Sequence, residues 1–298
     1  MGTLIAEIRV FLMEKERMKE AFRLAFYGKG GIGKTTVCCN VSAMLAGRGY
    51  RVLHIGCDPK ADSTRLLTEQ RIPNVLEQMA RLGGDIKISD ILFPGKQAGL
   101  FCIEAGGPKA GTGCAGAGIS AMNELLHELA IFEMGWDVIL YDVLGDVVCG
   151  GFSVPMKGEY VDKVFVISSS EYMSVYAANN ILQAVDLFSY HDSCLFGGII
   201  WNHCQTDWDR ELADSFSKLT RAEVIAYIDE WQELQRYDYA KKLIVQEQKP
   251  EKLWNQFSDL TDRILLRQQT TDQQKRIAPC SMAGLEEWRE AISRWNGK

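Results

Sequence analysis

The chain has 298 residues, of which 47% are hydrophobic and 24% charged; this is the composition of a folded globular protein and excludes a mainly disordered one. Its 33 basic and 39 acidic side chains give a net charge of −6, so no global basic field favours nucleic acid or an anionic membrane as a partner. No apolar run reaches the roughly 18 residues that a transmembrane helix needs.

The first twenty residues predict a helical N-terminal extension, ahead of one folded domain over residues 21–298. Glu7 and Arg9 interrupt the apolar part of this extension, and no small-residue cleavage site follows it, so we expect no secretory signal. The nine cysteines are therefore expected to be reduced thiols in the cytoplasm, some of them available as metal ligands.

Short apolar runs alternate with helix-length segments along the first two thirds of the chain. The runs predict buried strands at 24–27, 52–55, 101–104, 138–141, 164–167 and 196–201, and the segments predict helices at 34–47, 119–133 and 174–188. The last third reads as helical, at 209–219, 252–267 and 285–295. This alternation predicts an α/β fold, in which a mostly parallel sheet carries helices on both faces. Ligands of such sheets bind beyond the carboxyl ends of the strands.

A phosphate-binding loop follows the first predicted strand. Residues 28–35 fit the pattern G-x-x-x-x-G-K-[ST] between a strand and a helix, the context that supports the motif. Its backbone amides can surround phosphates, Lys34 can reach the β- and γ-phosphates, and the Thr35 hydroxyl can hold Mg²⁺. The sequence therefore predicts a P-loop NTPase domain. Its nucleotide-binding residues would be Gly28, Lys29, Gly30, Gly31, Ile32, Gly33, Lys34, Thr35 and Thr36.

Lys29 places an extra cation inside this loop. The form Lys-Gly-Gly-x-Gly-Lys-[ST]-Thr resembles the deviant P-loop of the class that includes partitioning ATPases, arsenite-pump ATPases and nitrogenase iron proteins. The resemblance implies a dimer that closes face to face over two nucleotides, with Lys29 aimed at a phosphate.

Acidic residues follow two of the predicted strands. Asp142 ends the run 137–141, with Gly145 and Asp146 shortly after it, while Asp58 and Asp62 flank Lys60 after the strand 52–55. Carboxylates at these strand ends can complete a Mg²⁺ shell and orient the attacking water. An Asp-x-x-Gly segment can also sense the γ-phosphate.

Two of the nine cysteines stand among glycines. Cys114 lies within residues 111–118, and Cys149 precedes Gly150 and Gly151. Backbone amides exposed by glycine favour a negatively charged iron–sulfur cluster. One chain supplies only two such thiols, so a Cys₄ site would form with a second copy across a two-fold axis. Zinc remains an alternative on ligand count alone.

Four segments closely resemble the nitrogenase iron protein family, which includes the iron–sulfur ATPases of dark-operative protochlorophyllide reductase, chlorophyllide reductase and nickel-tetrapyrrole reduction. They are residues 27–67, 106–118, 141–151 and 176–180. The resemblance implies a homodimer in which Cys114 and Cys149 of each subunit hold one shared [4Fe–4S] cluster. ATP hydrolysis would then drive electron delivery, with a ferredoxin or flavodoxin as the upstream donor and a two-subunit nitrogenase-like protein as the acceptor.

The resemblance also implies roles for individual residues. The matching nucleotide and switch positions are Lys29, Lys34, Thr35, Asp58, Lys60, Asp62, Asp142 and Asp146. Among them Lys29, Lys34, Asp58 and Asp146 would be catalytic, and Thr35 and Asp142 would serve Mg²⁺. Asn202 matches the residue expected to read adenine. Because residues 142–149 form one short run, a shift at the γ-phosphate would displace the backbone that holds Cys149.

The chain departs from the family at two surfaces. Ala117 stands where nitrogenase iron proteins carry an arginine that docks the partner, and residues 228–231 (Ile-Asp-Glu-Trp) replace a Pro-Arg-Asp stretch expected near the adenine. These departures predict a divergent reductase whose partner differs from the standard dinitrogenase protein.

The alternative function from another class is a non-redox P-loop ATPase, either a partitioning ATPase or an iron–sulfur cluster carrier. Basic patches or membrane-binding tails would favour a partitioning protein, and the charge of −6 supports neither. A cluster carrier would not need the γ-phosphate sensor and a cluster ligand on one continuous loop.

Overall fold

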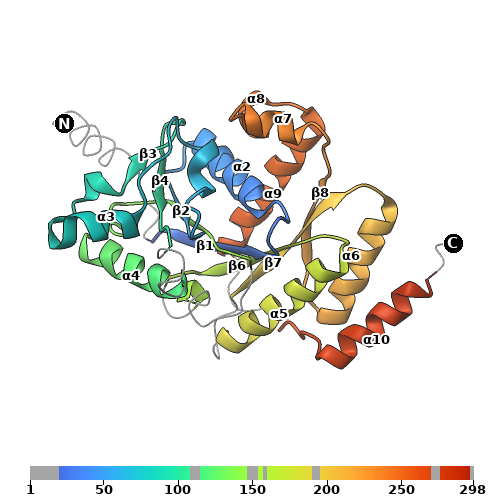
Figure 1. Cartoon of the computed structure of the whole chain (residues 1–298). Helices are drawn as coiled ribbons and strands as arrows, with labels where there is room; N and C mark the ends of the chain where they lie inside the picture. Colours follow the sequence, from blue (N-terminus) through green and yellow to red (C-terminus); the bar gives the residue numbers. More distant parts are fainter. Residues whose placement is uncertain are drawn as a thin grey trace.

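A parallel β-sheet runs through the centre of the molecule, as a computed structural model shows (Figure 1). The structure describes residues 20–107, 115–145, 154–156, 160–189, 195–269 and 276–295. Within them, eight strands form one sheet in the order β3-β4-β2-β5-β1-β6-β7-β8, in which only the β3–β4 pair is antiparallel. The strands are β1 (Phe22–Gly28), β2 (Val52–Gly56), β3 (Phe93–Pro94), β4 (Leu100–Glu104), β5 (Val138–Asp142), β6 (Lys163–Ser168), β7 (Phe196–Cys204) and β8 (Val224–Asp229).

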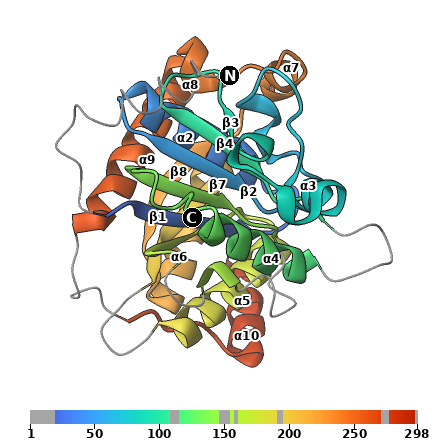
Figure 2. The ribbon, with the colours of Figure 1, turned by 90° about the vertical axis from the view of Figure 1, so that its left-hand side faces the viewer.

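Helices cover both faces of the sheet. They are α2 (Lys34–Gly47), α3 (Val75–Leu82), α4 (Ala115–Glu128), α5 (Tyr172–Phe188), α6 (Asp207–Thr220), α7 (Leu234–Tyr239), α8 (Ile244–Glu247), α9 (Glu251–Gln269) and α10 (Met282–Ser293). Figure 2 shows α2, α8 and α9 on one side of the strands, and α4, α5 and α10 on the other. Among the described helices, none is long and apolar enough to cross a membrane.

Each face has its own hydrophobic core because alternate strand residues point in opposite directions. Leu24 and Phe26 of β1 belong to the core beneath α2 and α9, whereas Ala25 and Tyr27 belong to the core beneath α4, α5 and α6. The strands therefore read as continuous apolar runs, since neither face of the sheet is solvated.

The register of the parallel strands gathers their carboxyl ends along one edge of the sheet. Gly28 at the end of β1 is paired with Ile167 of β6, and Asp142 at the end of β5 is paired with both Phe26 and Gly56. The loops that carry the predicted nucleotide residues leave the sheet from these neighbouring strand ends.

The predicted α/β architecture is confirmed, and each predicted strand is found with its bounds moved by at most a few residues. The helical interpretation of the last third is wrong at β8, which adds an edge strand beside β7. The helix predicted at 119–133 instead spans Ala115–Glu128. It stops early because Ala130 adopts φ +53°, and the chain then turns so that the Trp136 indole donates to the Ile131 carbonyl at 2.7 Å. The extension predicted at 1–20 lies almost entirely outside the described residues and stays a prediction.

Candidate functional site

The phosphate loop connects β1 directly to α2, as its sequence predicts. Gly31 and Gly33 adopt φ values of +80° and +83°, a region that side chains other than glycine rarely enter. The loop is also tightly packed: a Cβ on Gly28 would stand 2.5 Å from the Ile167 carbonyl oxygen, and one on Gly33 would stand 2.5 Å from the Asn202 amide nitrogen. Glycine is therefore required at both positions by the space available.

Asp142 is the centre of the hydrogen-bonding network behind this loop. Its Oδ1 accepts from Lys34 Nζ at 3.1 Å, and its Oδ2 accepts from Thr35 Oγ1 at 2.7 Å and from Ser63 Oγ at 2.6 Å. Burial by itself would raise the pKa of Asp142, but the charge of Lys34 and the hydrogen bonds from Ser63 and Thr35 lower it below the usual value. The carboxylate is thus ionised at neutral pH, and it holds the predicted phosphate-binding lysine in place.

The donor set around Asp142 fits magnesium. Mg²⁺ prefers hard oxygen ligands, takes few of them from the protein and keeps several waters. The Asp142 carboxylate and the Thr35 hydroxyl are hard oxygen donors that already lie 2.7 Å apart beside the phosphate loop. These two residues would hold the ion, directly or through water.

The second acidic loop lies close to the first. Asp58 and Asp62 are half-buried and Lys60 is exposed, and the Asp58 side chain accepts from the Lys60 backbone amide at 2.9 Å. Burial lowers the pKa of Lys34, but nearby negative charges raise it above its usual value overall. Asp142 is the strongest of these charges, and Asp58 is a weaker one. The structure therefore brings the Asp58 carboxyl within electrostatic reach of Lys34.

Gly145 lies directly against the phosphate loop. A Cβ at this position would stand 2.2 Å from the Gly28 carbonyl oxygen and 2.7 Å from the Gly30 amide nitrogen. The Asp-x-x-Gly segment therefore contacts the loop at both ends, through Asp142 and through Gly145. The other predicted residues of this region, Asp146, Cys149 and Cys114, lie outside the described residues.

Lys29 extends away from the loop and forms an ion pair with Glu171 at 3.0 Å, just before α5. The two side chains are 36% and 70% exposed, and ion pairs this exposed contribute little to stability. Lys29 can therefore leave Glu171 at little cost, and its predicted role at a phosphate stays a prediction.

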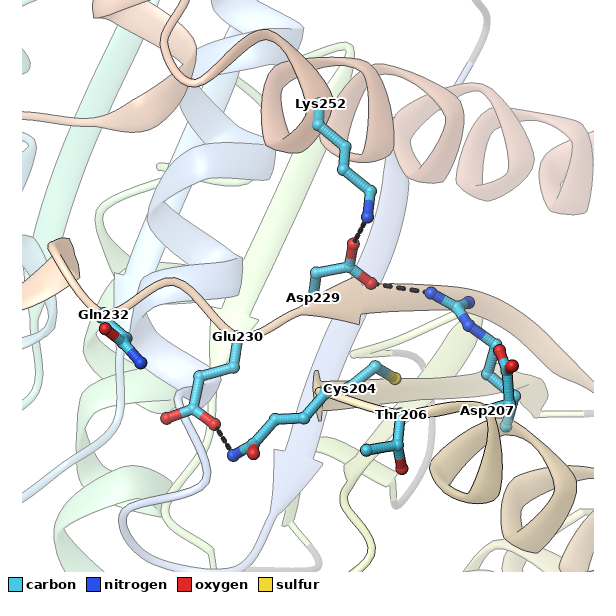
Figure 3. Close-up of a pocket in the computed structure, with 9 residues that line it drawn as sticks. Cys204, Thr206, Asp207, Asp229, Glu230, Gln232 and Lys252 are labelled. Atoms are coloured by element: carbon cyan, nitrogen blue, oxygen red, sulfur yellow. Dashed lines mark hydrogen bonds and ion pairs between the residues drawn. The ribbon is translucent and has the colours of Figure 1, made fainter.

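Two polar pockets lie near the phosphate loop and the carboxyl ends of β7 and β8. Asn202 is 7% exposed at the end of β7, and its amide nitrogen donates to the Ile32 carbonyl at 2.8 Å. A cavity of about 720 Å³ lies at the ends of β7 and β8, and its lining residues are shown in Figure 3. They are Cys204, Gln205, Thr206, Asp207, Arg210, Asp229, Glu230, Gln232 and Lys252. A second cavity of about 540 Å³, lined by Lys29–Ile32, shares Gln205 and Glu230 with the first, so the two hollows adjoin.

An acid holds two cations in the larger pocket. Asp229 at the end of β8 pairs with Arg210 at 2.7 Å and also with Lys252 (Figure 3). Sequence reasoning missed Arg210 and Lys252 because the strand that brings Asp229 to this edge was not predicted. The role of Asn202 at adenine stays a prediction, and its amide contacts the phosphate loop at Ile32.

Three further buried polar residues behind Asp142 were also missed. His54 has both ring nitrogens 2.9 Å from serine oxygens, those of Ser42 and Ser63. Glu104 accepts from the Thr64 amide at 2.6 Å. Ser63 stood within the run that resembles the iron protein family, but nothing in its local sequence indicated contact with Asp142.

The sequence matches a known protein family over most of its length. The family of 4Fe-4S iron sulfur cluster binding proteins, NifH/frxC family, matches residues 22–292. A nitrogenase iron protein of Methanospirillum hungatei JF-1 is 45% identical over 210 residues, 69% of this chain and 74% of that protein. A nitrogenase iron protein of Methanococcus voltae is 35% identical over 272 residues, 91% of this chain and 96% of that protein.

Solved structures resemble the fold at lower identity. The MinD cell division protein of Aquifex aeolicus superposes with a TM-score of 0.64 at 21% identity, over 86% of this chain and 100% of its own. The cell division ATPase MinD of Pyrococcus furiosus superposes with a TM-score of 0.65 at 18% identity, over 83% of this chain and 99% of its own. These similarities confirm the predicted P-loop NTPase fold.

Proposed function

Because the chain belongs to the NifH/frxC family of iron–sulfur cluster binding proteins, we propose that it is an ATP-dependent reductase that passes electrons to a nitrogenase-like enzyme. The family implies an iron–sulfur cluster, a nucleotide with Mg²⁺ and a homodimer. One observation carries the coupling of nucleotide to electron transfer: Gly145 lies against the phosphate loop, only four residues before Cys149.

The described residues support a division of labour around the nucleotide. Lys34, held by Asp142 at 3.1 Å, would bind the β- and γ-phosphates, and Thr35 with Asp142 would hold Mg²⁺. Asp146, which lies outside the described residues, would orient or deprotonate the attacking water, with Asp58 as the second candidate. When bound, Mg²⁺ neutralises the charge that develops on the phosphates.

Cys114 and Cys149 from two subunits would hold one bridging [4Fe–4S] cluster, which supplies one-electron chemistry when bound. Support comes from the glycine-flanked thiols and from the family, since both cysteines lie outside the described residues. Because Gly145 lies against the phosphate loop and Cys149 follows it by four residues, a change at the loop on nucleotide binding would be passed along the chain toward Cys149. A ferredoxin or flavodoxin supplies the electrons.

The electron acceptor is a two-subunit nitrogenase-like protein that differs from the standard dinitrogenase. Ala117 is exposed in the first turn of α4, three positions after Cys114. Alanine there cannot make the bidentate contact that the arginine of nitrogenase iron proteins offers a partner carboxylate.

Anaerobic purification tests the proposal most directly. We expect a brown protein with about four irons per dimer, and we expect Cys114→Ser or Cys149→Ser to lose the iron while the chain still binds nucleotide. Cys280→Ser is the matched control, because Cys280 is a half-buried thiol whose backbone bonds to Asn179 away from the nucleotide site. Full iron content and an unchanged electron spin resonance signal in both cluster variants would contradict the ligand assignment.

A second measurement separates the reductase from a non-redox ATPase or a cluster carrier. The reduced protein should transfer electrons to its acceptor only with MgATP, and the Lys34→Ala variant should not transfer them. Electron transfer at equal rates with and without MgATP would contradict the coupling.

A further inference from the structure

His54 sits in the middle of β2 and has no exposed surface. Its Nδ1 lies 2.9 Å from Ser42 Oγ on α2, and its Nε2 lies 2.9 Å from Ser63 Oγ. Ser63 in turn lies 2.6 Å from Asp142 Oδ2. A continuous line of side chains thus connects α2, β2, the short helix Ser63–Leu66 and the end of β5.

The direction of the hydrogen bonds follows from what each group can donate. Ser63 donates its single hydroxyl proton to Asp142 Oδ2 at 2.6 Å. Ser63 Oγ must then accept from His54 Nε2–H. Burial lowers the pKa of His54 to about 4, so the ring is neutral, Nδ1 carries no proton and Nδ1 accepts from Ser42. Every step of the line therefore donates toward Asp142.

This line connects the two acidic loops. Ser63 follows Asp62 directly, at the end of the loop that carries Asp58, Lys60 and Asp62. The next residue, Thr64, is held through its backbone amide by the buried Glu104 at 2.6 Å. Two short hydrogen bonds thus hold the end of this loop, and the one from Ser63 reaches the same Asp142 oxygen that Thr35 contacts.

We propose that His54 is a positioning residue for the magnesium nucleotide, acting through Ser63 on Asp142. The imidazole accepts from Ser42 and donates to Ser63, which leaves the Ser63 hydroxyl one productive orientation. Without this donor, Ser63 can rotate and Asp142 Oδ2 loses a directed partner. The inference rests on the nucleotide site of the proposed function, and it assigns that site a residue outside the phosphate loop.

The test uses the full-length protein, purified anaerobically, and titrates Mg²⁺ at saturating ATP. His54→Leu should weaken the apparent Mg²⁺ affinity by about tenfold, the size expected when a hydrogen bond to a charged group is lost. Ser63→Ala should weaken it to a similar extent, and the double variant should be no more than about twofold worse than either single variant, because both changes cut one line. ATP binding in EDTA should stay within about twofold of the wild type.

Two more variants distinguish positioning from general packing. His54→Gln supplies a side-chain amide that can donate to Ser63, and it should recover most of the Mg²⁺ affinity that His54→Leu loses. Thr261→Ala removes an equally buried hydroxyl in α9, which donates to the Phe257 carbonyl at 2.7 Å, and should lower thermal stability without changing Mg²⁺ affinity. If His54→Leu does not fold, Ser42→Ala removes the donor to His54 Nδ1 and should itself weaken Mg²⁺ affinity; unchanged affinity in that variant would overturn the proposal.

If His54→Leu keeps its Mg²⁺ affinity while Ser63→Ala loses affinity, the role of His54 is overturned. Fully additive losses of Mg²⁺ affinity in the double variant would also overturn it. An equal loss of ATP binding in EDTA would show a collapsed site instead of a mispositioned carboxylate and would also overturn it. A wild-type protein that binds no MgATP would overturn the proposed function itself.

Discussion

Asp142→Asn is expected to destabilise the protein in the absence of nucleotide and to abolish tight MgATP binding. Asp142 is 2% exposed and Lys34 9% exposed, so each charge has little contact with water. The amide oxygen of the asparagine can still accept hydrogen bonds on one side. Its amide nitrogen cannot accept them, yet it has to face a donor, either the Lys34 ammonium or the hydroxyls of Thr35 and Ser63. The lysine then remains buried without a compensating charge.

The size of the effect follows from this geometry. Removing one partner of a buried charge pair costs about 3–5 kcal/mol, because the remaining charge is left without its partner. For a domain of this size each kcal/mol lowers the melting temperature by about 2 °C or more, so the loss should reach roughly 6 °C. Removing Lys34 as well should return part of this stability, because no unpaired charge is then buried.

Thermal unfolding at one fixed protein concentration, without nucleotide, measures the effect. Asp259→Asn is the matched control, because Asp259 forms an ion pair of 2.8 Å with Arg263 and the two side chains are 60% and 50% exposed. A pair this exposed should contribute less than about 1 kcal/mol. If Asp142→Asn and Asp259→Asn lower the melting temperature equally, or if adding Lys34→Met does not restore stability to Asp142→Asn, the reasoning about a buried charge pair is refuted.

Three further outcomes follow from the site and its surroundings. Asp146→Asn should bind ATP normally but hydrolyse it slowly in a steady-state phosphate assay, and normal turnover would transfer the water-orienting role to Asp58. Alanine at position 117 replaces the docking arginine, and truncating an interfacial charge pair costs about 2–5 kcal/mol. The reduced protein with MgATP should therefore support little acetylene reduction by a standard molybdenum–iron protein. Rates near those of a true iron protein would contradict this. Burial raises the pKa of Glu104 from 4.5 to about 7, so the folded protein keeps a proton that the unfolded chain releases in this range. Stability should therefore fall by roughly 3 kcal/mol as pH rises through that window, and urea unfolding of Glu104→Gln should lack the slope.

The phosphate loop could be predicted from the sequence because its signal is local. The motif at residues 28–35 is recognised from its own residues, the apolar strand before it and the helix after it. The structure places all three as expected. Asp142 and Gly145 were also recognisable from local sequence, since Asp142 directly follows the apolar run 137–141 and Gly145 follows Asp142 by three positions. The family was identifiable for the same reason, because its motifs are short and contiguous.

The edge strand β8 was not predictable from its own residues. Val224–Asp229 has six residues, stands between helical segments and lacks flanking glycines. Its strand conformation is decided by pairing with β7, through contacts that lie tens of residues apart in the chain. The pocket of Asp229, Arg210 and Lys252 depends on this pairing and was missed with it.

The sequence by itself determined the fold class, the phosphate loop and the acids at the strand ends, because periodicity and spacing within a few residues specify each of them. Only the tertiary structure decided which partners Asp142 has. Ser63 reaches it from 79 residues away, and His54 reaches Ser63 only because β2 and the short helix after it fold against α2. A buried carboxylate must find its donors wherever the packed chain brings them, and that arrangement has no local pattern.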